Sequence, residues 1–303
     1  TAGSMWNNYL PNPHFVESFE TATGEKFNWD NYLPGYSTMK EKERVVFFLR
    51  DGLSAAEKER MTAYGADMSK YLDSGNEARI KKAYESRDPR LQMAIITPYA
   101  QYNGASSGIA HTYTLRWPYR GSDSAEPFDI RTDTNDKFYY LWRKFVPEGL
   151  EQTERDTYGL DIPLIRYAEV LLLKAEALNE WGSTHESEAI RCVNEVRRRA
   201  GHVELNNATY PATKVNGQSD LRERIRNEYY WEIGGEDSMY FHELRWGTWK
   251  DKKFDNNRNG LMQMWGETTY TWYWLGDQCW SWPIPAKEME MNSNLEQNEG
   301  WIN

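Results

Sequence analysis

The 303-residue sequence has few of the features that identify common protein classes. Its two cysteines, Cys192 and Cys279, can form at most one disulfide and cannot supply a zinc cluster. It has no run of 18 apolar residues, so the sequence predicts no membrane-spanning helix. Lys and Arg number 36 against 46 Asp and Glu, a net charge of −10, which argues against nucleic acid as a partner.

The motifs of familiar enzymes are also missing. No G-x-S-x-G, Walker or G-x-G-x-x-G element occurs, and the five histidines show no metal-ligand spacing. With 46 carboxylates in the chain, any Asp/Glu pair chosen as the acid and nucleophile of a glycosidase would be arbitrary. We therefore expect a protein that is not an enzyme and holds no cofactor.

Aromatic residues are what the sequence has in excess. Phe, Trp and Tyr make up 15% of a chain with 27% charged residues and a mean hydropathy of −0.86. Trp and Tyr offer flat apolar faces to the C–H side of a sugar ring, and Asn, Asp, Gln and Arg offer planar groups that bind its hydroxyls. Composition therefore makes sugar or peptide recognition the first hypothesis.

Proline and glycine divide the chain into three parts, which are residues 1–160, 161–250 and 251–303. In the loop-rich first part, the apolar residues 45–49 predict a strand, and a capping box at Ser54 and Glu57 predicts a helix over 54–71. The third part is rich in aromatic rings, and the rings of residues 265–282 are expected to lie mostly in the core, on one buried strand face.

The second part has the clearest regular structure. Its apolar periodicity predicts helices over 162–181 and 186–200, and a capping box at Ser183 and Glu186 separates them. Their spacing of small and apolar residues resembles a tetratricopeptide helix pair, which needs neighbouring repeats to complete its core. The arginine run 197–199 is expected on a solvated face. Further helices are expected at 220–233 and 237–246.

Four stretches carry motifs in an order and spacing typical of one family. They are Arg87-Asp-Pro-Arg-Leu91, residues 161–180, Glu243-Leu-Arg-Trp-Gly247 after Arg226-Asn-Glu228, and residues 282–300, which begin Trp282-Pro-Ile-Pro285. These stretches resemble the SusD/RagB-like outer-membrane nutrient-binding lipoproteins of Bacteroidota. One departure is Ile233-Gly-Gly-Glu-Asp237, where the family has FEG-x-R.

The resemblance implies a mainly α fold, in which tetratricopeptide-type helix pairs accompany a ligand-binding subdomain of long loops and short strands. It implies that residues 1–303 are the C-terminal part of a longer lipoprotein, with repeats and a lipid anchor before Thr1. It also implies a protein exposed on the outer-membrane surface that binds oligosaccharide or polysaccharide and delivers it to a SusC-like TonB-dependent transporter. RagB-like peptide binding and a helical glycoside hydrolase are the alternatives.

Residues 97–122 are the expected ligand site, because they combine aromatic and planar polar side chains in one loop region. The candidates are Trp117, Tyr119, Tyr102, Tyr113, Tyr99, Arg116, Arg120 and Asn103. Trp117 is the expected stacking platform. It stands before Pro118, which favours extended backbone, so we expect its ring to be exposed.

A calcium site is a weaker hypothesis. Asp255, Asn257 and Asn259 match the first half of an EF-hand loop, but its twelfth position is Gly266 rather than Glu. A polar surface turn is therefore the preferred interpretation of this segment.

Overall fold

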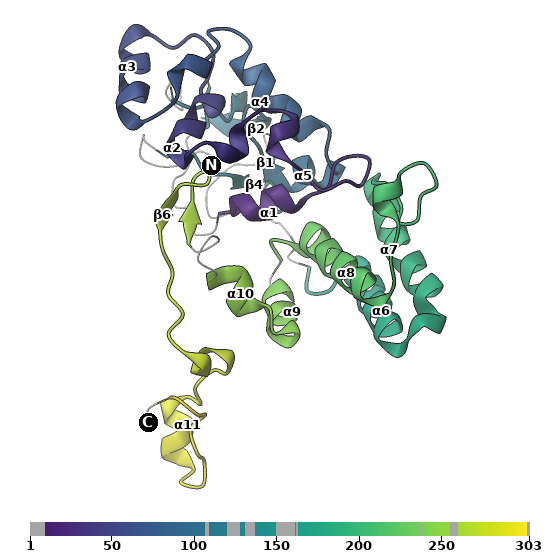
Figure 1. Cartoon of the computed structure of the whole chain (residues 1–303). Helices are drawn as coiled ribbons and strands as arrows, with labels where there is room; N and C mark the ends of the chain where they lie inside the picture. The colour runs from purple at the N-terminus through teal and green to yellow at the C-terminus, as the bar shows by residue number, and fades with distance from the viewer. Residues whose placement is uncertain are drawn as a thin grey trace. The chain divides into compact units, whose positions relative to one another are not determined.

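A computed structural model of the chain describes residues 10–106, 109–119, 128–130, 137–149, 161, 163–236, 238–254 and 260–301. The chain divides into two compact units. Unit 1 comprises Thr1–Glu236 and Met262–Glu267, and unit 2 comprises Asp237–Leu261 and Thr268–Asn303. Helices predominate in both units (Figure 1). Within the described ranges, no helix has the length and apolar character needed to cross a membrane.

The first half of unit 1 is built from short elements. Its α-helices are α1 (Pro13–Ser18), α2 (Glu41–Arg44), α3 (Ala55–Tyr64), α4 (Asn76–Glu85) and α5 (Pro89–Ala94). Its 3₁₀ turns are η1 (Trp29–Asn31), η2 (Tyr36–Thr38), η3 (Val45–Phe48) and η4 (Met68–Lys70). Its strands form two antiparallel pairs, β1 (Ile95–Ile96) with β4 (Leu141–Trp142), and β2 (Gln101–Ser106) with β3 (Ile109–Thr114).

Two elements of this half differ from expectation. The capping box of Ser54 and Glu57 forms and starts α3, but the helix ends at Tyr64 because Gly65 adopts left-handed backbone with φ 112°. The strand expected at 45–49 is wrong, because these residues form the 3₁₀ turn η3, whose side chains are all buried. A short, continuous apolar run fits a strand or a buried helical turn equally well, so periodicity could not separate them.

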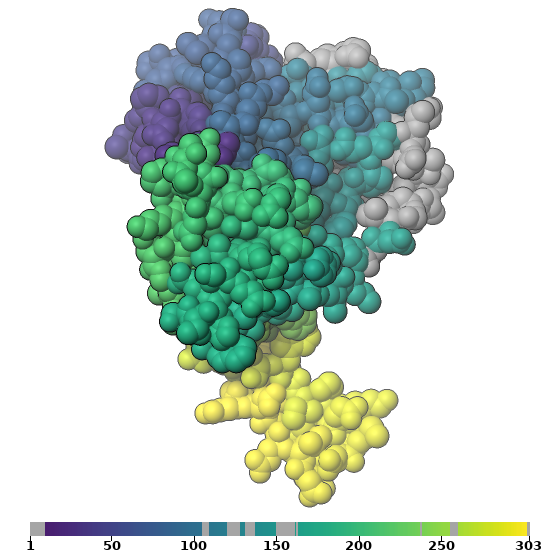
Figure 2. All heavy atoms as spheres, turned by 90° about the vertical axis from the view of Figure 1, so that its right-hand side faces the viewer, coloured from purple at the N-terminus to yellow at the C-terminus, as the bar shows by residue number. Residues whose placement is uncertain are grey.

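Three longer helices form the second half of unit 1 and gather on one face of it (Figures 1 and 2). They are α6 (Tyr167–Trp181), α7 (Glu186–Ala200) and α8 (Gln218–Ile233), with the 3₁₀ turns η5 (Ser183–His185) and η6 (Pro211–Thr213) between them. The predicted helix hairpin is confirmed by α6 and α7, although α6 starts at Tyr167 rather than 162. The capping box predicted at Ser183 and Glu186 is wrong. Residues 183–185 form η5, and α7 starts only after His185.

Two apolar regions stabilise unit 1. One lies in the first half, where Trp265 of the segment Met262–Glu267 is fully buried. Its ring packs on those of Phe48 and Trp117, with centroids 6.0 and 5.1 Å away. Among the three longer helices, Leu172 and Val193 are fully buried in the facing surfaces. Both regions bury apolar area, which is the main favourable contribution to folding.

Buried ion pairs join the two halves of unit 1. Arg90 on α5 pairs with Glu228 on α8 at 2.6 Å, and Arg197 on α7 pairs with Glu228 at 2.8 Å and with Glu20 at 3.1 Å. The arginine run was expected on a solvated face, which is wrong for Arg197, whose side chain is fully buried. Because a buried charge without a partner is costly, these pairs fix α5 against α7 and α8.

Unit 2 contains shorter elements and many aromatic rings. Its elements are α9 (Ser238–Trp246), α10 (Trp249–Phe254), β6 (Thr268–Tyr270), η7 (Asp277–Trp280) and α11 (Ala286–Met291). Strand β6 pairs with β5 (Leu261–Met262). The rings do not form one buried strand face as expected, because Tyr270 and Trp282 are largely exposed. Instead, Trp249 contacts Phe254 and Trp274 edge-on, each at 5.4 Å.

Candidate functional site

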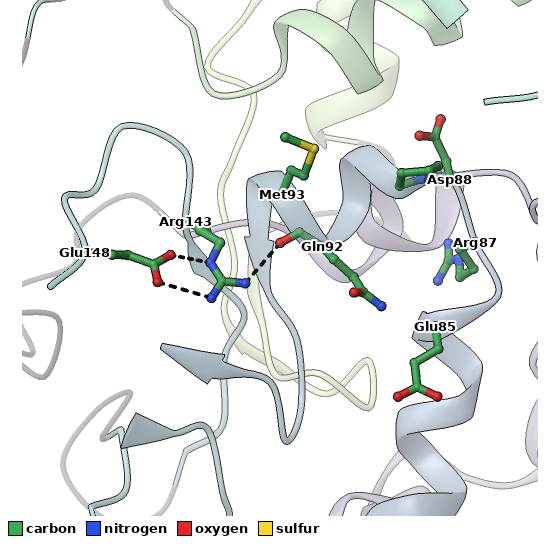
Figure 3. Close-up of a pocket in the computed structure, with 8 residues that line it drawn as sticks. Glu85, Arg87, Asp88, Gln92, Met93, Arg143 and Glu148 are labelled. Atoms are coloured by element: carbon green, nitrogen blue, oxygen red, sulfur yellow. Dashed lines mark hydrogen bonds and ion pairs between the residues drawn. The ribbon is translucent and has the colours of Figure 1, made fainter. Parts of the chain in front are cut away.

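A pocket of about 600 Å³ lies in unit 1 where α4 ends and α5 begins (Figure 3). Its lining residues are Glu85, Arg87, Asp88, Pro89, Gln92, Met93, Arg143 and Glu148. The Asp88 side chain starts α5 by accepting the Arg90 backbone N–H, and Pro89 occupies the first turn, where an N–H is not needed. The next turn of α5 then brings Gln92 and Met93 to the pocket.

Arg143 fixes one wall of the pocket. Its Nε donates to Glu148 Oε1 at 2.6 Å, its Nη1 donates to the Gln92 carbonyl at 3.3 Å, and its Nη2 donates to the Gln101 carbonyl of β2. Glu148 also accepts the backbone N–H of Asn103 at 3.3 Å. Since these bonds engage every nitrogen of the guanidinium, Arg143 is a positioning residue. Gln92 and Glu148 are the groups on this wall that can bind a ligand.

The opposite corner of the pocket carries fixed charges. Burial by itself would raise the pKa of Asp88, but the hydrogen bonds and charge of Arg90 hold this pKa below its ordinary value. Arg87 donates to the carbonyls of Val16 and Phe19, at 2.6 and 2.9 Å. Burial lowers the pKa of Arg87 to about 10, so its guanidinium remains charged at neutral pH.

The β2–β3 hairpin adjoins the pocket through Gln101 and Asn103 and carries aromatic rings. Gly104 leaves room for one of them, because a Cβ at this position would lie 2.8 Å from Cε2 of Tyr113. His111 is paired with Gly104 across the hairpin and stacks on Phe128, with ring centroids 4.0 Å apart. Tyr113 and His111 are half-buried and Asn103 is exposed. His111 and Tyr113 therefore lie on one face of the hairpin, and the Asn103 amide lies on the opposite face, because side chains alternate along a strand.

The sequence model of the SusD family matches residues 1–301. This chain belongs to the SusD family. A SusD-like protein of Formosa agariphila is 32% identical over 139 residues, which are 46% of this chain and 24% of that protein. The starch-binding protein SusD of Bacteroides thetaiotaomicron is 28% identical over 161 residues, which are 53% of this chain and 25% of SusD. Each of these matches spans about a quarter of the relative's length.

Two solved structures from Bacteroides fragilis share the SusD fold. A SusD-like protein superimposes with a TM-score of 0.61 at 19% identity, covering 98% of this chain and 48% of that chain. A SusD-like carbohydrate binding protein superimposes with a TM-score of 0.52 at 22% identity, covering 94% and 48%. The mainly helical SusD-like fold expected from the sequence is confirmed, over about half the length of these structures.

The expected stacking platform lies in the core of this SusD-family chain. Trp117 is 4% exposed and packs on Trp265 and Phe138, with ring centroids 5.1 and 6.2 Å apart. Tyr99 and Tyr102 are also buried. The expectation of an exposed Trp117 ring is wrong, because an extended backbone before proline does not decide to which side the ring turns. These three rings stabilise the fold that carries the site.

The other expected site residues lie nearer the surface or outside the described residues. Asn103 is exposed, and Tyr113 and Tyr119 are half-buried. Arg116 is half-buried, and its Nη1 donates to Asp129 at 3.0 Å. Arg120 lies outside the described residues. Contact between these residues and a ligand stays a prediction.

No metal site emerges among the residues that the structure describes. The weak calcium candidate, Asp255, Asn257 and Asn259, lies outside them. Within the described ranges, no group of three or more His, Cys, Asp and Glu residues could hold a metal ion.

Sequence reasoning missed several residues of the pocket and hairpin, which are Glu85, Gln92, Met93, His111, Arg143 and Glu148. They come from separate segments that meet only in the folded chain. One signal could have found the pocket, because the family motif Arg87-Asp-Pro-Arg-Leu91 forms the start of α5 and the pocket's corner.

Proposed function

We propose that this protein binds glycans without catalysing a reaction on them. The binding site is the pocket between α4, α5 and Arg143–Glu148, together with the exposed part of the β2–β3 hairpin. The observation that carries the proposal is membership of the SusD family over residues 1–301. The name of one relative, a starch-binding protein, supports the same class of ligand.

The chemistry of the site suits a sugar. Gln92 and Glu148 supply a planar amide and a planar carboxylate for hydroxyl groups, and Tyr113 and His111 supply rings for a C–H face. Glu148 is held in place by Arg143 and by the Asn103 backbone N–H. Holding a binding group in one geometry before the ligand arrives lowers the entropic cost of binding.

A peptide ligand is less well supported. Extended peptides commonly add a strand to an exposed sheet edge. At Asn103 the edge of β2 is already paired, since its carbonyl accepts the Gly149 N–H at 2.7 Å and its N–H donates to Glu148 at 3.3 Å. This pairing leaves the edge unsuited to a peptide strand at that point, so we favour the glycan.

The role of the whole protein follows from the family resemblance. We infer that the full-length protein carries further helix pairs and a lipid anchor, is exposed on the outer-membrane surface, and delivers glycan to a SusC-like TonB-dependent transporter. Affinity purification of the tagged protein from its native membrane tests this step. Recovery without a TonB-dependent transporter would contradict it.

Binding is tested by native affinity electrophoresis with amylopectin, laminarin, xylan and pectin, followed by chromatography of the recovered glycan. We expect retardation by at least one polysaccharide and no shortened products. Gln92→Ala should weaken that binding by about 1 kcal/mol, the usual contribution of a neutral hydrogen bond, without lowering the melting temperature. Glu59→Ala, an exposed change on α3, is the matched control. Shortened products would instead support a glycoside hydrolase.

A further inference from the structure

The last turn of α6 carries an exposed tryptophan whose ring is held in place. Trp181 is 75% exposed. Its indole stacks on His185 of η5, with ring centroids 4.1 Å apart and planes 22° apart. The imidazole therefore covers one face of the indole, and the opposite face is open to solvent. An indole this exposed gains little from the hydrophobic effect, so fold stability does not account for it.

Hydrogen bonds between α6 and α8 hold the turn that carries Trp181. The Asn179 amide donates to the Gln218 carbonyl at 3.2 Å, and the Gln218 amide donates to the Asn179 carbonyl at 2.7 Å. Glu180 accepts two hydrogen bonds from Arg222, each at 2.7 Å. The indole thus stands on an ordered helix end, which lowers the entropic cost of using it for binding.

The surroundings of Trp181 favour a sugar over a protein partner. Other apolar side chains exposed on α6 lie in its first half and are Tyr167, Val170 and Leu173. Trp181 follows Leu173 by eight positions, about 12 Å along the helix. The exposed side chains between them include Lys174 and Glu180. Centres of protein interfaces are depleted in charged residues, whereas a sugar site combines an apolar face with planar polar groups.

We propose that the Trp181–His185 stack is a second glycan-contact site, separate from the pocket and hairpin, that binds a pyranose ring of a polysaccharide through its C–H face. This inference rests on the glycan-binding function proposed above. As part of this proposal, Glu180 and Arg222, which pair with each other at the same end of α6, are assigned as acceptor and donor for the ring's hydroxyl groups. The stack belongs to the α6–α8 part of unit 1, and this part is toward the viewer in Figure 2. Two contacts on one long chain reinforce each other, so the second site raises the affinity for polysaccharides.

The test uses native affinity electrophoresis with amylopectin, laminarin, xylan and pectin. For the polysaccharide that retards the wild type, Trp181→Ala should raise the dissociation constant by about tenfold, within the range found for stacking on aromatic side chains. Trp181→Tyr keeps an aromatic face and should retain most of the affinity. Tyr167→Ala removes a similarly exposed ring from the same helix and should bind like the wild type. All three variants should melt at the wild-type temperature.

Other outcomes overturn the inference. Wild-type affinity in Trp181→Ala would remove the second site, and so would an equal loss in Tyr167→Ala. A changed oligomeric state of Trp181→Ala on size exclusion, with unchanged glycan affinity, would assign the ring to a protein contact. If Gln92→Ala weakens binding and Trp181→Ala does not, the second site alone fails. If the wild type binds no polysaccharide, both the proposed glycan-binding function and the second site fail.

Discussion

At the scale of single residues, Gly104 controls the space above the β2–β3 hairpin. A methyl group there would lie 2.8 Å from Cε2 of Tyr113 and 3.4 Å from Cε1 of Tyr102. Tyr102 is fully buried, so the Tyr113 ring is the one that must move. The absence of a side chain at position 104 therefore decides how Tyr113 is presented.

Gly104→Ala should weaken glycan binding, because it displaces the Tyr113 ring. We expect a loss of about 1–3 kcal/mol in binding free energy, the range known for stacking on aromatic side chains, measured by titration calorimetry. Glu59→Ala, an exposed change on α3 away from the hairpin, is the control and should bind normally. Unchanged affinity in Gly104→Ala would exclude Tyr113 from the site.

Trp117→Ala should destabilise the protein, since the ring packs on Trp265 and Phe138 in the core. The expected loss in the free energy of unfolding is about 3–5 kcal/mol, as for other buried Trp residues, measured by urea denaturation. Trp282→Ala removes an exposed ring and should change stability by no more than about 0.5 kcal/mol. Equal stability of both variants would contradict the placement of Trp117 in the core.

The sequence predicted a ligand site in residues 97–122 but not which of its rings are buried. In the structure, β2 of this region lies beside the pocket, since Arg143 of the pocket wall donates to the Gln101 carbonyl, and ligand contact there stays a prediction. Whether a ring there is buried depends on residues distant in the chain, such as Phe138 and Trp265, and local patterns carry no information about them. Arg197 shows the same limit, because its partner Glu228 lies on another helix.

At the scale of elements, periodicity was a good guide where a helix has one apolar face. The stripe of Ala189, Val193 and Val196 correctly predicted α7, and all three residues are buried. Helix starts were harder to predict. Ser183 had the sequence of an N-cap, yet the chain between the two helices forms a 3₁₀ turn, and local capping preference yields to that connection.

Packing of α5 against α8 depends on Arg90. Arg90→Met should lower the free energy of unfolding by about 3–5 kcal/mol, because it leaves the buried carboxylates of Asp88 and Glu228 without this partner. Urea denaturation measures the change. Arg198→Met removes an exposed pair with Glu204 and should leave the free energy of unfolding nearly unchanged. Similar losses in the two variants would show that the Arg90 network contributes little to stability.

At the scale of the whole molecule, family recognition succeeded because short motifs are spread along most of the chain. The first begins at Arg87 and the last ends at Gly300, so their common order identifies a fold that no single motif could. The same approach could not predict burial in the tail. The alternation of aromatic residues there was compatible with a buried strand, but β6 ends at Tyr270, and Trp282 is exposed.

The acid stability of the whole molecule should depend on Asp88. Its pKa is lowered in the folded chain, where the hydrogen bonds and charge of Arg90 outweigh the effect of burial. A carboxyl group of this kind stabilises the fold above its unfolded pKa, about 3.9. The stabilisation is lost as the pH falls through the lower, folded pKa.

The net charge of the protein also affects its stability at acid pH. Repulsion among its charges is smallest near the isoelectric point of about 5.2 and grows again below it. Wild type and variant share this effect, so their difference isolates Asp88. Asp88→Asn should be less stable at neutral pH and should lose less stability on acidification to about pH 3. Urea denaturation of both proteins across this range measures the two slopes. Parallel slopes would show that Asp88 has the same pKa in the folded and unfolded chain.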